Sequence, residues 1–277
     1  MKQLYTVTIL GALLSLCSCQ NESANAEAQE TNPGRKLLME SIDAHGGIEK
    51  WRSNGALQFR WTYHMSDLGK VVDSVQIVDP NTFAAVHSVP NSEVKFGRND
   101  ADGRYWIHPD SAEFGIPPQF WTLTPIYFIG IPFVFDDEGA NLELLDETKS
   151  FEGKDYTQVK ITYQASAGES PDDHYVLLID PATKLVKGAY YTVTNPLVFK
   201  GGTPIEKFIT LDNLTDIGGL LLAGGHKTYT MTDGKIEDQL RYTEISQVAF
   251  LERDKTDFSA PTGAKFLDPV PQKADSQ

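Results

Sequence analysis

The run Asp172-Asp173-His174 is the densest group of side chains in the sequence that could perform acid–base or metal chemistry. Neighbouring side chains on a strand point to opposite faces, so only Asp172 and His174 could act together. Two ligands leave a metal site incomplete. Because Pro171 precedes the run, a turn leading into a strand is the simpler interpretation. A hydrolase that uses Asp172 and His174, or an unassigned pair of carboxylates, is therefore the least favoured function.

The other patterns for catalysis or metal binding are incomplete. None of the six histidines belongs to an H-x-x-x-H or H-E-x-x-H pattern. His45 stands where a first helix should end, which favours a structural cap. Residues 99–103 (NDADG) lack the ligand spacing and closing glutamate of a calcium loop, and no G-x-S-x-G sequence occurs. We therefore expect a non-enzymatic protein with no metal and no other cofactor.

A different chemistry, acylation of a thiol, is offered by residues 16–19 (LCSC). They end an N-terminal stretch with one positive charge, Lys2, and an apolar run too short to span a membrane. Such a stretch is typical of a secretory signal peptide. The four residues resemble a bacterial lipobox, in which a small serine precedes Cys19, whereas a bulky leucine precedes Cys17. By that resemblance residues 1–18 are removed and Cys19 carries the lipid.

Charge and cysteine content support an anchor of this kind. The net charge is −14 and the isoelectric point is about 4.8, so the surface repels nucleic acid and anionic headgroups. The sequence has two cysteines, and the mature chain would keep only Cys19 with its sulfur acylated, so it would form no disulfide. Residues 19–32 would be the lipidated cysteine and a flexible polar tether. The residue after Cys19 is Gln20, whereas an aspartate there would indicate retention in the inner membrane in some bacteria. Gln20 therefore favours the outer membrane in the envelope of a Gram-negative bacterium.

Residues 114–135 (FGIPPQFWTLTPIYFIGIPFVF) form an uncharged segment that contains four prolines. Proline interrupts helices, so the segment is not a clean membrane span. We expect one or two short helices or an apolar loop on the concave face of a sheet. Together with strand residues, the segment could either line a hydrophobic pocket or simply fill the core. The residues expected to line the pocket are Phe59, Trp61, Phe120, Trp121, Tyr127, Phe128, Ile131 and Phe133.

The elements that would position these side chains are mostly strands. Asn32 and Pro33 predict the start of a helix that ends at Gly46-Gly47. Residues 57–63 then alternate between apolar and polar side chains, as a half-buried strand does. The other strands are expected at residues 71–78, 82–87, 104–107, 141–147, 155–163, 174–179, 185–194, 205–212, 226–231 and 239–250. The predicted class is mainly β (α+β), with one large antiparallel sheet.

Three stretches resemble the LolA/LolB-like superfamily of bacterial lipoproteins and lipoprotein-sorting proteins. They are residues 42–51 (IDAHGGIEKW), 131–145, and 213–222 with its Gly-Gly-Leu turn. The resemblance implies a large curved antiparallel sheet that forms a half-open barrel, with an N-terminal helix and short helices over the concave face. It also implies a single domain over residues 33–253. Residues 254–277 contain several prolines, lysines and aspartates, and we expect them to form a loosely packed tail.

The predicted function is a lipid-anchored, non-enzymatic envelope lipoprotein that binds a hydrophobic ligand in its half-barrel. The expected partners are the membrane, through the lipid, and a hydrophobic small molecule or the acyl chain of a lipoprotein. Nucleic acid is not expected. The alternative is a structural or interaction lipoprotein whose barrel is filled and holds no ligand.

Overall fold

The computed structural model describes residues 32–163, 170, 172–204 and 206–270. The predicted signal peptide, Cys19 and nearly all of the predicted tether lie outside these residues. Within the described part of the chain, no helix is both long and apolar enough to cross a membrane.

The elements are short, apart from a few long strands. The helices are α2 (Pro33–Ala44), α3 (Ile48–Ser53), α4 (Pro118–Trp121) and α5 (Thr124–Ile129), with 3-10 turns η1 (Ser66–Leu68), η2 (Phe133–Phe135) and η3 (Arg253–Lys255). The strands are β1 (Ala56–Met65), β2 (Lys70–Val78), β3 (Ala85–Ser88), β4 (Lys95–Arg98), β5 (Tyr105–His108), β6 (Ala140–Leu144), β7 (Lys149–Phe151), β8 (Lys154–Tyr163), β9 (Tyr175–Ile179), β10 (Val186–Tyr191), β11 (Lys207–Thr210), β12 (Thr215–Ile217), β13 (Leu220–Leu222), β14 (Gly225–Thr232), β15 (Lys235–Leu251) and β16 (Lys265–Phe266).

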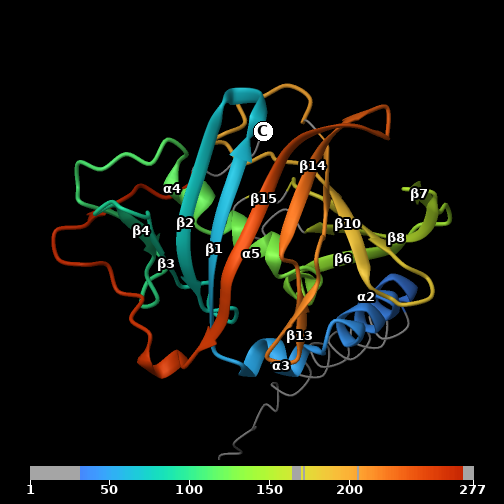
Figure 1. Ribbon diagram of the computed structural model, residues 1–277, viewed down its shortest axis with the longest axis horizontal. Coiled ribbons are helices and arrows are strands. Elements are labelled where there is room, and N and C mark those ends of the chain that lie inside the picture. The colour runs from blue at the N-terminus through green and yellow to red at the C-terminus, as the bar shows by residue number, and fades with distance from the viewer. Residues whose placement is uncertain (1–31, 164–169, 171, 205, 271–277) are drawn as a thin grey trace, which may run out of the picture.

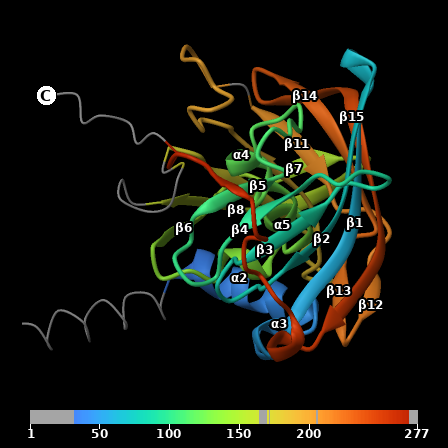
Figure 2. The same cartoon turned by 90° about the vertical axis from the view of Figure 1, so that its left-hand side faces the viewer.

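One large antiparallel sheet dominates the molecule. Its strand order is β16-β5-β4-β3-β2-β1-β15-β14-β11-β10-β9-β8-β6, and β7 pairs with β8. The sheet curves but does not close, because β16 and β6 remain at its two edges. Figures 1 and 2 show α4 and α5 lying within the curve, with α2 and α3 at one end. The predicted fold class, an open half-barrel with helices over its concave face, is confirmed.

All eleven predicted strands coincide with or overlap a strand of the structure. The periodicity did not reveal β4, whose Gly97 occupies a position without room for a side chain. A Cβ on Gly97 would lie 2.0 Å from the carbonyl oxygen of Ala85. The short strands β7, β12, β13 and β16 were also not among the predicted strands, although the family resemblance placed a Gly-Gly-Leu turn where β12 and β13 meet.

The N-terminal helix begins and ends as its residues predict. The Asn32 side chain accepts a hydrogen bond from the backbone N–H of Arg35 at 2.9 Å, and Pro33 occupies the first turn. At the other end, the backbone of Gly46 has φ 117°, and a Cβ there would lie 2.2 Å from the Gly219 oxygen. The β12–β13 hairpin, which contains the Gly-Gly-Leu turn, therefore packs directly against the end of α2.

The apolar segment folds as α4, α5 and η2, in agreement with the expectation of short helices. Ile126 and Ile129 of α5 have no exposed surface, and Phe135 is equally buried. These side chains belong to the main hydrophobic core. The segment thus supplies core residues as well as a cover for the concave face.

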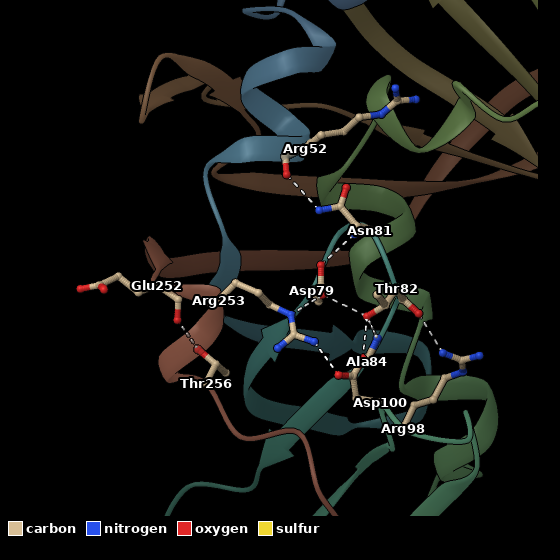
Figure 3. Close-up of polar contacts among 10 residues, drawn as sticks. All are labelled: Arg52, Asp79, Asn81, Thr82, Ala84, Arg98, Asp100, Glu252, Arg253 and Thr256. Carbon is tan, nitrogen blue, oxygen red and sulfur yellow. Dashed lines mark hydrogen bonds and ion pairs between the residues drawn. The ribbon is translucent and has the colours of Figure 1, made fainter.

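A polar cluster fixes one corner of the sheet (Figure 3). The Asp79 carboxylate, 4% exposed, accepts hydrogen bonds from the Thr82 hydroxyl at 3.0 Å and from Arg253 Nε. Arg253 Nη2 also donates to Asp100 at 2.6 Å. Because Arg253 follows β15 and Asp79 follows β2, this cluster joins the end of the central strand to the neighbouring turn.

The sequence after residue 253 packs more closely than a loose tail would. Phe258 is only 2% exposed, and the Arg253 guanidinium lies 4.7 Å from its ring centroid. Farther along, β16 pairs with β5 and forms an edge of the sheet. Apolar residues spaced among prolines thus anchor this segment, although no periodicity predicts it.

Candidate ligand-binding cavity

A cavity of about 710 Å³ lies between the concave face of the sheet and the segment that contains α4 and α5. Its walls come from β1, β10, β11, β14 and β15, from the two helices, and from loop residues around Ile116 and Val198. Most of the lining side chains are apolar or aromatic. Volume and composition both fall in the usual range for small-molecule sites.

Aromatic pairs join the sheet to the helices across the cavity wall. The Trp61 ring of β1 stacks on Phe128 of α5 with a centroid separation of 6.5 Å. The Tyr63 ring lies 5.5 Å from Trp121 of α4, and Phe128 meets Tyr191 of β10 edge-on at 4.9 Å. Aromatic pairs of this kind contribute free energy beyond that from burial of their surface, and so help to keep the wall in one position.

Five of the eight residues predicted to line a pocket do line this cavity: Trp61, Phe120, Trp121, Tyr127 and Phe128. The structure does not bring the other three to it. Phe59 has no exposed surface because it lies deeper on β1 than Trp61 does, and Ile131 is 1% exposed. Phe133 stacks on Trp51 at 5.0 Å and is 2% exposed. These three side chains belong to the solid core beneath the cavity.

A buried histidine attaches the cover to the sheet. His87 of β3 donates from Nε2 to the carbonyl oxygen of Thr122, just after α4, at 3.0 Å. The Thr122 hydroxyl in turn donates to the Pro118 oxygen at 2.7 Å. Burial lowers the pKa of His87 to about 3, so the ring is neutral at physiological pH. The position of α4 is therefore set by a hydrogen bond rather than by an ion pair.

Two carboxylates stand on one side of the cavity. Asp173 accepts a hydrogen bond from the Thr194 N–H at 2.6 Å, and Asp137 accepts one from the Gly139 N–H at 2.6 Å. Burial raises the pKa of Asp173 to about 6. The main chain thus provides partners for both acids.

Two cations line another part of the wall, Lys207 of β11 and Arg241 of β15, and a third, Arg98 of β4, lines the cavity and donates to the Thr82 carbonyl oxygen at 2.9 Å. Arg241 forms a two-pronged ion pair with Asp67, with both N···O distances at 2.7 Å. It also donates to the Tyr63 hydroxyl at 3.3 Å. Burial and the charge of Arg241 lower the pKa of Lys207.

The structure does not unite Asp172 and His174 in the cavity. His174 Nε2 lies 3.2 Å from the Glu206 carboxylate, and its Nδ1 lies 3.3 Å from the Thr192 hydroxyl. Neither Asp172 nor His174 lines the cavity, whereas the intervening Asp173 does. The carboxylate in the cavity wall is therefore that of Asp173, the residue that strand alternation excluded from a site with Asp172 and His174.

No histidine of the described chain lines the cavity, and the described residues contain no group of three or more His, Cys, Asp or Glu that could hold a metal ion. His45 caps α2 as predicted, with Nδ1 2.8 Å from the Ser41 oxygen. His226 lies behind the wall, 5.2 Å from the Trp61 ring. Burial lowers the pKa of His226 to about 4, so it too is neutral.

Comparisons with known proteins give a family match over part of the chain and several distantly similar structures. A family of unknown function, DUF6503, matches residues 121–221, from the end of α4 to β13. No curated protein matches the chain. Among solved structures, a LolA-superfamily protein from Nitrosomonas europaea is similar, with a TM-score of 0.48 and 11% identity over 78% of this chain and 93% of that one.

Two further solved structures are similar over comparable lengths. A DUF1329-family protein from Desulfovibrio piger has a TM-score of 0.43 and 11% identity, covering 79% of this chain and 94% of that one. A domain from Vibrio parahaemolyticus named for outer-membrane lipoprotein sorting has a TM-score of 0.43 and 12% identity, covering 80% and 94%. All three solved structures have TM-scores below 0.5. At such low identity they say nothing about a ligand, so the case for one rests on the cavity itself.

Sequence reasoning missed the polar residues of the cavity, above all Lys207, Arg241 and Asp173. A usable signal existed for Lys207. Lys207 stands two and four residues before Ile209 and Leu211, which are both buried. Residues spaced by two share a face of a strand, so the sequence places this lysine on the inner, otherwise apolar face. No comparable signal marks Asp173, because the preceding loop hides where the strand alternation begins.

Proposed function

We propose that this protein is a non-enzymatic binding protein that holds a hydrophobic ligand in the cavity beneath α4 and α5. The observation that carries the proposal is the cavity of about 710 Å³, walled by aromatic side chains. A closely packed interior leaves few voids larger than a water molecule. An apolar space of this size inside a curved sheet therefore favours an occupant over a structural accident.

The segment with α4 and α5, which covers the cavity, is attached to strands β1 and β3 of the sheet. Trp61 and Tyr63 hold α5 and α4 through ring contacts, and His87 binds the backbone at Thr122. Such a preformed site keeps the entropic cost of binding low. The same features favour binding over the alternative of an interaction lipoprotein with a filled barrel.

A hydrolase receives less support than a binding protein. The residues predicted for it, Asp172 and His174, do not line the cavity. Asp173 and Asp137 each accept a hydrogen bond from a backbone N–H, and no histidine of the described chain stands beside them in the cavity wall. General acid–base chemistry needs a donor and acceptor aimed at a common substrate.

The test is direct recovery and displacement of a ligand. Native mass spectrometry of the full chain, isolated from its host membranes, should show a bound apolar molecule. The protein should also bind the neutral fluorescent probe N-phenyl-1-naphthylamine. Leu123→Trp, which places a larger side chain in the cavity wall, should weaken probe binding at least tenfold.

Leu68→Trp is the matched control, because Leu68 is 55% exposed and lies outside the cavity wall. It should leave probe affinity within about twofold. A full chain that is consistently free of ligand and does not bind the probe refutes the proposal. Equal loss of affinity in the two variants also contradicts it, since the cavity would then not be the site.

We further propose that the mature protein is attached to a bacterial envelope membrane, favouring the outer membrane, through lipid on Cys19. The lipobox-like residues and the net charge of −14 support this proposal, because so acidic a chain does not adhere to anionic lipid by charge. The anchor would place any ligand beside one membrane. Cys19→Ala should move the protein from the membrane to the soluble fraction, and a variant that stays with the membrane overturns the proposal.

A further inference from the structure

The apolar cavity contains one lysine whose charge is not paired within the described chain. Lys207 lies directly opposite Tyr191 of β10 and Thr230 of β14, and it shares the inner face of β11 with Ile209. None of the described residues forms an ion pair or a side-chain hydrogen bond with its ammonium group. A half-buried ammonium group without a partner is costly, so its retention on an apolar face calls for a function.

The neighbouring charges do not neutralise Lys207. Asp67 is the acid that acts on it, but both carboxylate oxygens of Asp67 accept hydrogen bonds from Arg241 at 2.7 Å. Arg241 and Asp67 therefore cancel each other. Lys207 contributes the uncompensated positive charge on this side of the cavity.

The acidic residues of the cavity lie on the other side. Asp173 lies two residues before the start of β9, which is separated from β11 by β10. Two strand spacings place it about 10 Å away. Asp173 and Asp137 already accept backbone hydrogen bonds from Thr194 and Gly139. Lys207 thus offers a position for an anion that neither acid occupies, and the third lining cation, Arg98, belongs to β4, which is not a neighbour of β11 in the sheet.

We infer that the ligand is a single-chain amphiphile whose anionic headgroup, a carboxylate or a phosphate, pairs with Lys207. Its hydrocarbon chain would lie along the aromatic wall formed by Trp61, Tyr127 and Phe128. This inference rests on the proposed function and specifies the chemistry of its ligand. A charged acceptor at Lys207 would complete the hydrogen bonding of the ammonium group, which a purely apolar ligand cannot do.

The experiment compares ligands with the same chain and different headgroups in the full chain. Hexadecanoate, hexadecyl phosphate and hexadecan-1-ol are each used to displace N-phenyl-1-naphthylamine. We expect at least one of the two anions to bind about tenfold or more tightly than the alcohol, and whichever anion binds more tightly identifies the headgroup. Lys207→Gln should remove that preference while hexadecan-1-ol binding stays within about twofold.

Two further variants separate charge from structure. Lys207→Arg keeps the charge and should retain most of the preference for the anion. Lys227→Gln makes the same charge change on the exposed face of β14, outside the cavity wall, and should have no effect.

The outcomes distinguish this inference from the proposed function. If the probe and the alcohol bind but neither anion is preferred, the inference is wrong while the binding function stands. If Lys207→Gln weakens all three ligands equally, the lysine has a structural role and the inference is likewise overturned. If neither the probe nor any ligand binds, both proposals fail.

Discussion

Phe133 and Phe120 provide the sharpest test of where the cavity ends and the core begins. Both were predicted to line a pocket, but only Phe120 does so in the structure. Phe133 is 2% exposed, stacks on Trp51 at 5.0 Å with an interplanar angle of 10°, and meets His45 edge-on at 6.2 Å. The two aromatic rings should therefore respond in opposite ways to truncation.

Phe133→Ala should lower the free energy of unfolding by about 3–5 kcal/mol, because it removes a fully packed ring and leaves a void. Phe120 is partly exposed beside an existing cavity, so Phe120→Ala leaves no closed void and should cost only about 1 kcal/mol. For the affinity of N-phenyl-1-naphthylamine the order reverses. Phe120→Ala should weaken it several-fold, whereas Phe133→Ala should change it by less than about twofold.

Urea unfolding followed by circular dichroism measures the first quantity, provided that the slope of the transition is the same in all variants. Fluorescence titration measures the second. Since domains typically have only about 5–15 kcal/mol of stability, Phe133→Leu, which should cost less than about 2 kcal/mol, serves where the alanine variant fails to fold. If truncation of Phe133 weakens probe binding strongly while stability is retained, the assignment of this ring to the core is wrong.

Three further predictions concern pH and the ends of elements. Because the pKa of Asp173 is raised to about 6 in the folded state, the native state binds more protons than the unfolded state between about pH 4 and 6, and this residue makes stability fall as pH rises through that window. The urea midpoint should therefore fall less between pH 4.5 and 7.5 in Asp173→Asn than in the unchanged protein. An equal fall in the two proteins contradicts the raised pKa. Gly46→Ala should lower the free energy of unfolding by well over 1 kcal/mol in thermal denaturation, because the new Cβ would clash with the Gly219 oxygen. Gly47→Ala, also at positive φ but with nothing within 4 Å of the new Cβ, should lower it clearly less. Equal losses in the two variants would mean that backbone strain alone, and not the clash, sets the cost. Arg253→Ala removes a partner of the buried Asp79 carboxylate and should lower the free energy of unfolding in urea by about 1–3 kcal/mol. The control Lys255→Ala changes an exposed ion pair and should lower it by less than about 1 kcal/mol. Similar values for the two variants would show that the corner cluster of Figure 3 does not stabilise the fold.

Local sequence signals predicted most of the secondary structure because each acts over a few residues. The cap at Asn32 and the strand alternation of residues 57–63 are examples, and both agree with the structure. Elements stabilised by distant partners were missed. β16 exists because Lys265 and Phe266 pair with β5, more than a hundred residues earlier in the chain. No window of local sequence contains that information.

The site was predicted less completely than the fold, because periodicity reports which face a side chain occupies but not how deep it lies. Phe59 and Trp61 share the inner face of β1, yet Phe59 belongs to the closed core and Trp61 lines the cavity. The difference comes from the helical segment, which fills the concave face at one end of the strand and covers open space toward the other. Depth along a strand is thus set by a tertiary contact that alternation cannot encode.

Polar residues that interrupt an apolar inner face restore part of this information. On the face of β11 that carries Lys207 and Ile209, both residues line the cavity, whereas Leu211, two residues farther along, is buried and does not line it. On β15, Arg241 and Thr243 also line the cavity. A charged residue that strand alternation places inside a sheet costs free energy unless it meets water, a counter-ion or a ligand. In a half-barrel it therefore marks where the core ends and a ligand headgroup can be bound, which is how Lys207 distinguishes a site for an amphiphile from a purely apolar void.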